Sequence, residues 1–289
     1  MKKIFTIISL LTFALVLIPF ASAQTTDAAG FRGQSMNGST GLFSIPTGRV
    51  GWDKTKNFGL DFGYRAMINN DMGTTHIPAI TMTLFKTVEI STAFDIQPDF
   101  DKNNYYYRDN EENGDLLLGL KIKLPTNPAT PIAIGFNFQS LNIGNNKYDY
   151  HAFQPYVAIT YKGTFFAMPA ETTVVFGKTF YSDEYDNNSN IDFGMGFDII
   201  LFPDVFKNAV HWIIDFANFG YSDHAWPNNF HGTNTSAVWR GILNTGFRID
   251  ISSIPAINKY KFLIDFIFND LFDAGQRSFT VGAVFGLEI

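Results

Sequence analysis

The sequence predicts an all-β protein: an antiparallel transmembrane β-barrel of about twelve strands with a short N-terminal plug-like segment. Three observations lead to this fold class. Apolar and polar residues alternate with a period of two in many short segments. The gaps between these segments are alternately long and short. After Ala23, no apolar run approaches the length of a membrane-spanning helix.

The alternating segments are the elements that we expect to form strands. In "VEISTAFDI", Val88, Ile90 and Phe94 share one face, whereas Glu89 and Asp95 share the other. Throughout the series one face is large and apolar, and the other is small, polar or charged. The clear segments are 58–66, 88–96, 115–123, 132–139, 191–201, 239–249, 260–268 and 279–289, and weaker ones lie near 77–85, 153–161, 172–180 and 210–216.

The lengths of the connections distinguish between two folds that share this alternation. A soluble sandwich buries its apolar faces, whereas a membrane barrel turns them toward lipid. Long loops at one rim and short turns at the other are typical of membrane barrels. An even number of strands then places both termini at the short-turn rim, which we expect to be periplasmic. The long gaps lie near 67–76, 97–114, 141–151, 181–190, 219–235 and 269–277, and the short ones near 86–87, 125–131, 163–170, 202–208 and 251–258.

The final segment, "FTVGAVFGLEI", is expected to close the barrel by pairing with the first strand. It resembles the C-terminal signal of outer-membrane barrels, with Ile289 standing where an aromatic residue is usual.

Met1–Ala23 has the pattern of a secretory signal peptide, with two lysines, an apolar run and the small-residue site Ala21-Ser22-Ala23. We expect cleavage near Ala23, the alternative being an uncleaved anchor, and localisation in the outer membrane of a diderm bacterium. The expected partners are the lipid bilayer and the barrel-assembly machinery. The 27 acidic residues exceed the 21 basic ones, which argues against nucleic-acid binding, and the absence of Cys excludes disulfides.

Residues 24–55 precede the barrel (56–289) and are rich in Gly, Ser and Thr. We expect an ordered segment at the periplasmic mouth, the alternative being a disordered spacer. Arg32 and Arg49 would meet inward carboxylates such as Asp61, Asp192 or Asp265. The candidate plug residues are Arg32, Pro46, Thr47 and Arg49.

Within this segment, "GLFSIPTGRV", followed by "FGLDFGY", resembles the start of YjbH-like outer-membrane barrel proteins. The resemblance implies a barrel associated with the export of extracellular polysaccharide. The alternative is that Pro46-Thr47-Gly48 is only a turn. The matching residues are Gly41, Leu42, Pro46, Thr47 and Gly48.

The polar face of the strands is expected to line the lumen. Mixed charges there either line a water-filled path for polar solutes, or pair with one another and with a plug to close it. The lumen-facing candidates are Asp61, Arg65, Glu89, Asp95, Lys121, Lys123, Asp192, Asp198, His211, Asp215, Arg240, Arg248, Lys261 and Asp265.

The sequence carries no catalytic or cofactor motif, and we expect neither an enzyme nor a bound cofactor or metal. His224 and His231 share one loop, where solvated side chains are the expected state, the alternative being a metal site completed by a carboxylate such as Asp223. Ser222-Asp223-His224 are consecutive and cannot converge as a triad. We therefore expect a small channel or export-associated pore for polar solutes, with carbohydrate or polysaccharide as a candidate cargo. The alternative is a structural or surface-interaction, adhesin-like barrel without transport.

Overall fold

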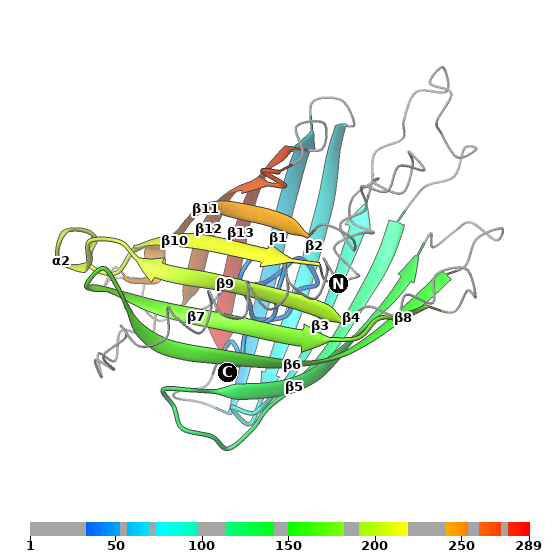
Figure 1. Ribbon diagram of the computed structural model, residues 1–289, viewed down its shortest axis with the longest axis horizontal. Coiled ribbons are helices and arrows are strands. Elements are labelled where there is room, and N and C mark those ends of the chain that lie inside the picture. The colour runs from blue at the N-terminus through cyan, green and yellow to red at the C-terminus, as the bar shows by residue number, and fades with distance from the viewer. Residues whose placement is uncertain are drawn as a thin grey trace, which may run out of the picture.

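The fold is taken from a computed structural model (Figure 1). It describes residues 33–52, 57–69, 73–96, 114–141, 150–181, 191–218, 241–253, 260–272 and 277–289. The predicted signal peptide, His224 and His231 lie outside these ranges.

Twelve antiparallel strands form a closed ring, which confirms the predicted fold class. Each strand pairs with its neighbours in the chain, and β1 pairs with β13 to close the ring. A four-residue helix, α2 (Pro203–Phe206), lies between β9 and β10, and a 3-10 turn, η5 (Ile251–Ser253), follows β11. The strands are β1 (Phe58–Asn69), β2 (Gly73–Leu84), β3 (Val88–Ile96), β4 (Gly114–Lys123), β5 (Ile132–Leu141), β6 (Tyr150–Phe165), β7 (Met168–Gly177), β9 (Asp192–Ile200), β10 (Val210–Ala217), β11 (Ile242–Asp250), β12 (Lys261–Asn269) and β13 (Ser278–Glu288).

A short additional strand, β8 (Phe180–Tyr181), prolongs β7 along the same partner, β6. The ladder is interrupted opposite Pro155 of β6, which has no N–H to donate. The backbone N–H of Lys178 still donates to the Pro155 carbonyl at 3.1 Å, so the two pieces follow one another without a change of direction.

Two predicted gaps are shorter than expected. The long gap predicted at 67–76 is mostly strand, because Thr74 and Thr75 pair with Ile68 and Met67, and only residues 70–72 separate β1 from β2. The gap predicted at 163–170 shrinks to a two-residue turn at Phe166 and Ala167, with φ values of 46° and 64°. Turns of this mirror-image type match the twist of paired strands. Polar residues can extend a strand when the neighbouring strand offers partners in register. The alternation of apolar and polar residues does not reveal this register.

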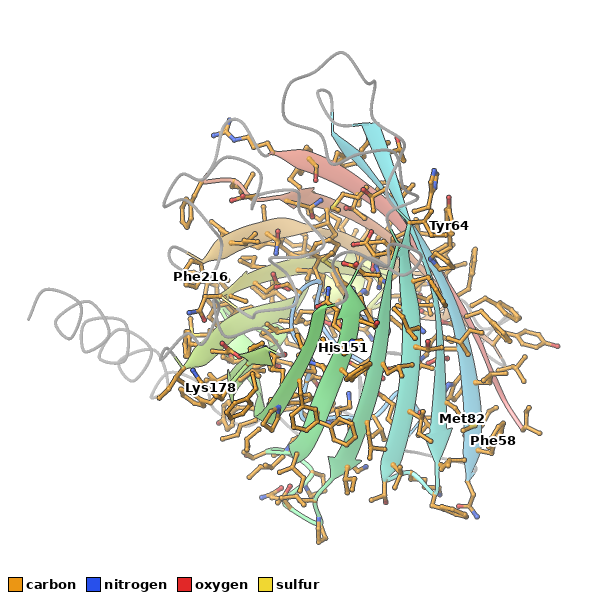
Figure 2. The ribbon with its side chains drawn as sticks, turned by 90° about the vertical axis from the view of Figure 1, so that its right-hand side faces the viewer. Phe58, Tyr64, Met82, His151, Lys178 and Phe216 are labelled. Atoms are coloured by element: carbon orange, nitrogen blue, oxygen red, sulfur yellow. The ribbon has the colours of Figure 1, made fainter. Side chains whose placement is uncertain are left out.

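The outer face of the barrel is apolar and the inner face is polar. Phe62, Tyr64 and Phe94 are 43–47% exposed, and Figure 2 shows Tyr64 on the outside of β1. The adjacent inward residues Asp61 and Arg65 are at most 1% exposed. A continuous apolar outer face is incompatible with water and fits a lipid bilayer, so the barrel is a transmembrane one.

The described segments contain no helix with the length and apolar character needed to span a bilayer.

Candidate functional site: a plugged lumen

Residues 33–52, here called the plug, lie inside the ring of strands (Figure 1). Every residue of the plug is buried. The plug folds on itself through isolated bridges that pair Gln34 with Thr40 and Gly41 with Pro46. Because an interior segment has little access to water, the barrel wall must provide partners for its remaining polar groups.

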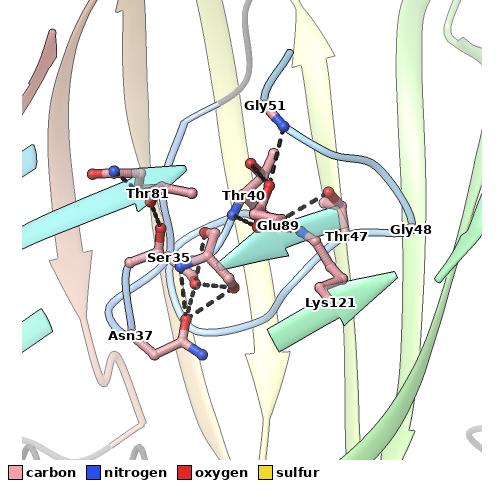
Figure 3. Close-up of polar contacts among 12 residues, drawn as sticks. Ser35, Asn37, Thr40, Thr47, Gly48, Gly51, Thr81, Glu89 and Lys121 are labelled. Atoms are coloured by element: carbon pink, nitrogen blue, oxygen red, sulfur yellow. Dashed lines mark hydrogen bonds and ion pairs between the residues drawn. The ribbon is translucent and has the colours of Figure 1, made fainter. Parts of the chain in front are cut away.

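Glu89 on β3 holds the middle of the plug (Figure 3). Its Oε1 accepts a hydrogen bond from the Thr40 backbone N–H at 2.7 Å, and its Oε2 accepts one from Gly51 N at 3.1 Å. Lys121 on β4 pairs with Glu89 at 2.8 Å and donates to the Thr40 carbonyl at 2.8 Å. Charge-assisted bonds of this kind are about twice as strong as neutral ones. Two neighbouring strands thus hold the plug at Thr40 and at Gly51.

Asp215 on β10 holds the opposite side of the plug. Its Oδ2 accepts from the backbone N–H groups of Phe43 and Ser44, both at 2.7 Å, and its Oδ1 accepts from Ser44 Oγ at 2.9 Å. Asn244 on β11 donates to the same carboxylate at 2.8 Å. A single carboxylate therefore satisfies the turn at Phe43 and Ser44 without help from water.

The Trp52 side chain fits between the barrel wall and an internal ion pair. Its indole Nε1 donates to Asp61 Oδ1 on β1 at 2.7 Å, and Lys261 Nζ on β12 donates to Asp61 Oδ2 at 2.7 Å. The same ammonium lies 5.0 Å from the centre of the Trp52 ring, within the range of a cation–π contact. This contact fixes the end of the plug that leads into β1.

Two arginines of the wall bind backbone carbonyls of the plug. Arg248 on β11 forms a two-pronged ion pair with Asp265 on β12, at 2.7 and 3.1 Å, and donates to the Gly41 carbonyl at 3.3 Å. Arg65 on β1 donates to the carbonyls of Ser35 and Gln34. Arginine suits this task because its planar fork can serve a carboxylate and a carbonyl together.

A relay of amides connects the plug to the wall near the long loops. Asn37 donates to Asn137 Oδ1 at 2.5 Å, and Asn137 donates to Gln154 Oε1 at 2.9 Å. Gln154 in turn donates to Asp192 Oδ2 at 2.9 Å. This chain joins β5, β6 and β9 behind the plug.

Arg49 corrects one expectation about the plug. The carboxylate that it meets is Glu171 on β7, at 3.0 Å, which the sequence analysis did not place in the lumen. The expected partners are engaged elsewhere: Asp61 by Lys261, and Asp192 by hydrogen-bonding side chains. Which carboxylate an arginine reaches depends on the path of the plug, and this path is not encoded locally.

The plug also has an apolar side, which packs on inward-facing apolar residues of the wall. Its contributors are Met36, Leu42, Phe43 and Ile45. Burying each such side chain stabilises by about 1.5–3 kcal/mol, so the four together contribute on the order of 10 kcal/mol. The inward apolar partners from the wall are Met67, Ile77, Ala79, Ala93, Leu117, Tyr156, Ala158, Val175, Ile213, Ala217, Ile242 and Ile267.

Glycines in the wall make room for the plug. A Cβ added at Gly196 would collide with the Leu42 side chain, and one added at Gly63 would collide with Gln34. At Gly194 the nearest plug atom to such a Cβ would be Ile45 Cγ2, at 2.6 Å. Strand glycines often mark a place where another chain segment approaches closely. At these positions the wall has no side chain, and the plug occupies the space that a side chain would fill.

The structure places most of the lumen-facing candidates in the interior. Lys123 and Asp198 are only partly buried, because they lie at the short-turn ends of β4 and β9. Thr47 is buried and donates its backbone N–H to the Thr40 carbonyl at 3.1 Å. Arg32 and Arg240 lie outside the described residues. The buried candidates are Asp61, Arg65, Glu89, Asp95, Lys121, Asp192, His211, Asp215, Arg248, Lys261 and Asp265.

His211 is a bridge between wall elements. Its Nδ1 lies 2.6 Å from Asp198 Oδ1, and its Nε2 lies 3.1 Å from the Asn208 carbonyl. Both ring nitrogens are therefore engaged in joining β9 to the turn before β10. No group of three or more His, Cys, Asp or Glu that could hold a metal ion occurs among the described residues.

Several residues that hold the plug were missed by sequence analysis. Trp52 precedes the first strand, and Glu171 lies just before the weak segment predicted at 172–180. Thr81, which accepts from Gln34 Nε2 at 2.7 Å, and Thr160, which accepts from Gly48 N at 2.9 Å, lie in segments where the alternation is weak. Asn137 and Gln154 are uncharged, so a search for inward charges passes over them. The alternation on β5 would have placed Asn137 on the inner face.

The inward charges are distributed unevenly along the barrel. Lys121, Arg248 and Lys261 lie toward the short-turn ends of their strands, where each is paired with a carboxylate. Asp95 and Asp192 lie at or next to the long-loop ends of theirs, as does Asp115. Among the described residues of that end, the basic side chain of Lys178 lies near Asp192 and acts on it through its charge. The described part of the entrance from the long-loop side is therefore predominantly acidic.

Comparison with known proteins gives structural matches only. No protein-family model and no curated protein matches the chain. Omp33 of Acinetobacter baumannii aligns over 82% of this chain and 100% of its own, with a TM-score of 0.44 and 11% identity. LpxR of Salmonella typhimurium aligns over 80% and 100%, with a TM-score of 0.44 and 9% identity. The COG4313 outer membrane channel of Pseudomonas putida F1 aligns over 91% and 99%, with a TM-score of 0.44 and 11% identity. These likenesses concern the barrel architecture.

Proposed function

We propose that the protein is an outer-membrane pore for small polar solutes, held closed by residues 33–52. The observation that carries this proposal is the hollow wall beside the plug. Gly63, Gly194 and Gly196 face plug side chains, so the wall does not fill its own lumen there. A barrel with a purely structural role can fill its interior with wall side chains.

The wall is also suited to remain folded when the plug moves. Lys121 pairs with Glu89, Lys261 with Asp61, and Arg248 with Asp265. All six groups belong to strands, so each charge keeps a partner without the plug. Removal of the plug would therefore leave these three ion pairs intact on the lumen wall, which supports a water-filled path.

The acidic entrance supports a preference among solutes. Asp95, Asp115 and Asp192 attract cations and repel anions at the long-loop end. We infer that the open pore passes small cations and cationic solutes more readily than anions. A carbohydrate cargo is proposed only from the resemblance of residues 41–48 to YjbH-like proteins. Sugars added during the planar-bilayer recordings described below would test whether a carbohydrate enters the pore.

The test is deletion of residues 25–49 with the signal peptide retained. This deletion leaves Trp52, whose indole bonds to Asp61. The variant should still fold, as judged by heat-modifiable gel mobility, and should conduct in planar bilayers. The wild type should conduct rarely, since expelling four apolar side chains costs on the order of 10 kcal/mol. The reversal potential of the current should show that cations pass more readily than anions.

The apolar contacts of the plug favour a second candidate, a permanently closed barrel with a structural or surface-interaction role. In that case the plug is part of the core and opening has no function. A folded deletion variant that carries no current at any voltage would support this candidate and contradict the pore.

A further inference from the structure

Two acidic residues lie side by side on the inner wall near the long loops. Asp95 on β3 is directly opposite Asp115 on β4 in the ladder. Their side chains are 1% and 5% exposed, respectively. The carboxylate of Asp95 makes no hydrogen bond to the plug. Asp95 is therefore separate from the contacts that close the lumen.

The carboxylate of Asp95 differs from the other buried carboxylates of the lumen. Neither of its oxygens has a hydrogen-bond partner. Asp215, by contrast, accepts four hydrogen bonds, and Asp265 accepts two from Arg248. A buried charge without partners costs several kcal/mol. Such a group in a native fold requires a compensating ligand or proton.

A third oxygen lies beside the pair. Gln139 on β5 is opposite Leu117 of β4 and donates its Nε2 to Asp115 Oδ2 at 3.1 Å. The residue is only 2% exposed, and its buried amide oxygen, Oε1, has no hydrogen-bond partner. Because Oε1 shares a carbon with Nε2, it also lies close to the Asp115 carboxylate. Three adjacent strands thus bring two carboxylates and an amide oxygen together.

We propose that Asp95, Asp115 and Gln139 bind a divalent cation, with Ca²⁺ as the best match. The group offers only oxygen ligands, which suit hard cations and not zinc or copper. Ca²⁺ tolerates irregular geometry and can complete its shell with water, whereas Mg²⁺ demands a regular octahedron. The bound cation neutralises the charge of the Asp95 carboxylate, which has no hydrogen-bond partner in the protein. The proposal depends on the barrel fold and not on pore activity.

The test uses the full-length protein, purified in detergent and stripped with EDTA. Titration calorimetry with CaCl₂ should show binding in the range of about 10⁻⁴–10⁻³ M, as for sites with few charged ligands. The unfolding temperature, read from heat-modifiable mobility, should rise with CaCl₂ but not with NaCl of equal ionic strength. Mg²⁺ should bind more weakly than Ca²⁺.

Variants locate the site. Asp95→Asn should weaken Ca²⁺ binding by about tenfold or more, because ligand charge sets the affinity of such sites. Asp192→Asn is the matched control, since Asp192 is a buried acid at the same end whose carboxylate is already satisfied by Thr179 and Gln154. Its Ca²⁺ affinity should stay within about twofold of the wild type. If Asp95→Asn does not fold, Gln139→Met removes the amide oxygen and should also weaken binding.

Two results would overturn the proposal. One is a wild type that neither binds Ca²⁺ nor gains thermal stability up to about 10 mM, well above the expected range. A rise in the unfolding temperature of Ca²⁺-free Asp95→Asn would then point to a proton shared by the two carboxylates. The other is Ca²⁺ binding that Asp95→Asn and Gln139→Met leave unchanged, which would place the ion elsewhere.

Discussion

Lys261 on β12 and Asp61 on β1, 200 positions apart in the chain, form a 2.7 Å ion pair with both side chains fully buried in the lumen. β13 lies between their strands. The pair therefore crosses a strand on the inner wall, at the position where the Trp52 indole joins the plug to β1.

Breaking this pair from one side should destabilise the barrel strongly. Lys261→Met removes the ammonium but leaves a buried carboxylate, and we expect a loss of about 3–5 kcal/mol in the free energy of unfolding. Adding Asp61→Asn removes the charge left behind and should recover most of the loss. Urea unfolding in lipid vesicles measures both. Equal losses in the single and double variants would mean that the pair is not coupled.

A disulfide can test whether the plug must move. The chain has no Cys, so the pair Ile45→Cys and Gly194→Cys would be unique. A Cβ at Gly194 would lie 3.6 Å from Ile45 Cβ, within the range for a disulfide. We expect the oxidised variant to be fully closed in planar bilayers and the reduced one to regain the rare openings of the wild type. Ile45→Cys alone serves as the control, because a side chain at Gly194 would collide with the native Ile45. Openings that persist after oxidation of the double variant would contradict a moving plug.

Loss of the carboxylate that holds the plug turn should loosen the plug. Asp215→Ala removes the acceptor of the Phe43 and Ser44 N–H groups. We expect more frequent openings, because bonds to a charged group are worth about 1.5–3 kcal/mol each. Asp192→Ala is the comparison, since Asp192 accepts hydrogen bonds from Gln154 and Thr179 of the wall. Similar behaviour of the two variants would show that the contacts of Asp215 do not control opening.

The outer face should reject charge. Leu118 on β4 is 39% exposed on the outside of the barrel, whereas its neighbour Gly119 faces Ser91 in the interior. Leu118→Arg should cost about 2–4 kcal/mol near the middle of the bilayer. Unfolding in lipid vesicles measures the loss, and Leu118→Met is the control. Full tolerance of arginine would indicate that this face does not contact lipid.

Labelling on intact cells tests the orientation of the barrel. Asn127 lies in the short turn between β4 and β5. If this rim is periplasmic, Asn127→Cys should not react with an impermeant thiol reagent. Cysteines at Asn113 or Asn188, which belong to long connections outside the described residues, should react. The opposite labelling pattern would show that the barrel has the reverse orientation in the membrane.

The sequence by itself determined the strands and their two faces. Successive residues of a strand point to opposite sides, so the alternation of Ile90 with Glu89 and Ser91 already separates lipid from lumen. Connection lengths then favoured a barrel over a sandwich. These signals are local, so a single sequence can carry them.

Tertiary structure decided which inward groups meet. Lys261 reaches Asp61, and Arg49 reaches Glu171, because strand stagger and the path of the plug set their positions inside the ring. The loop predicted at 67–76 became strand for the same reason, since Thr74 and Thr75 gain ladder partners only when β1 and β2 are aligned. Side-chain alternation is a property of each strand alone, whereas register and interior packing depend on all the strands and the plug together.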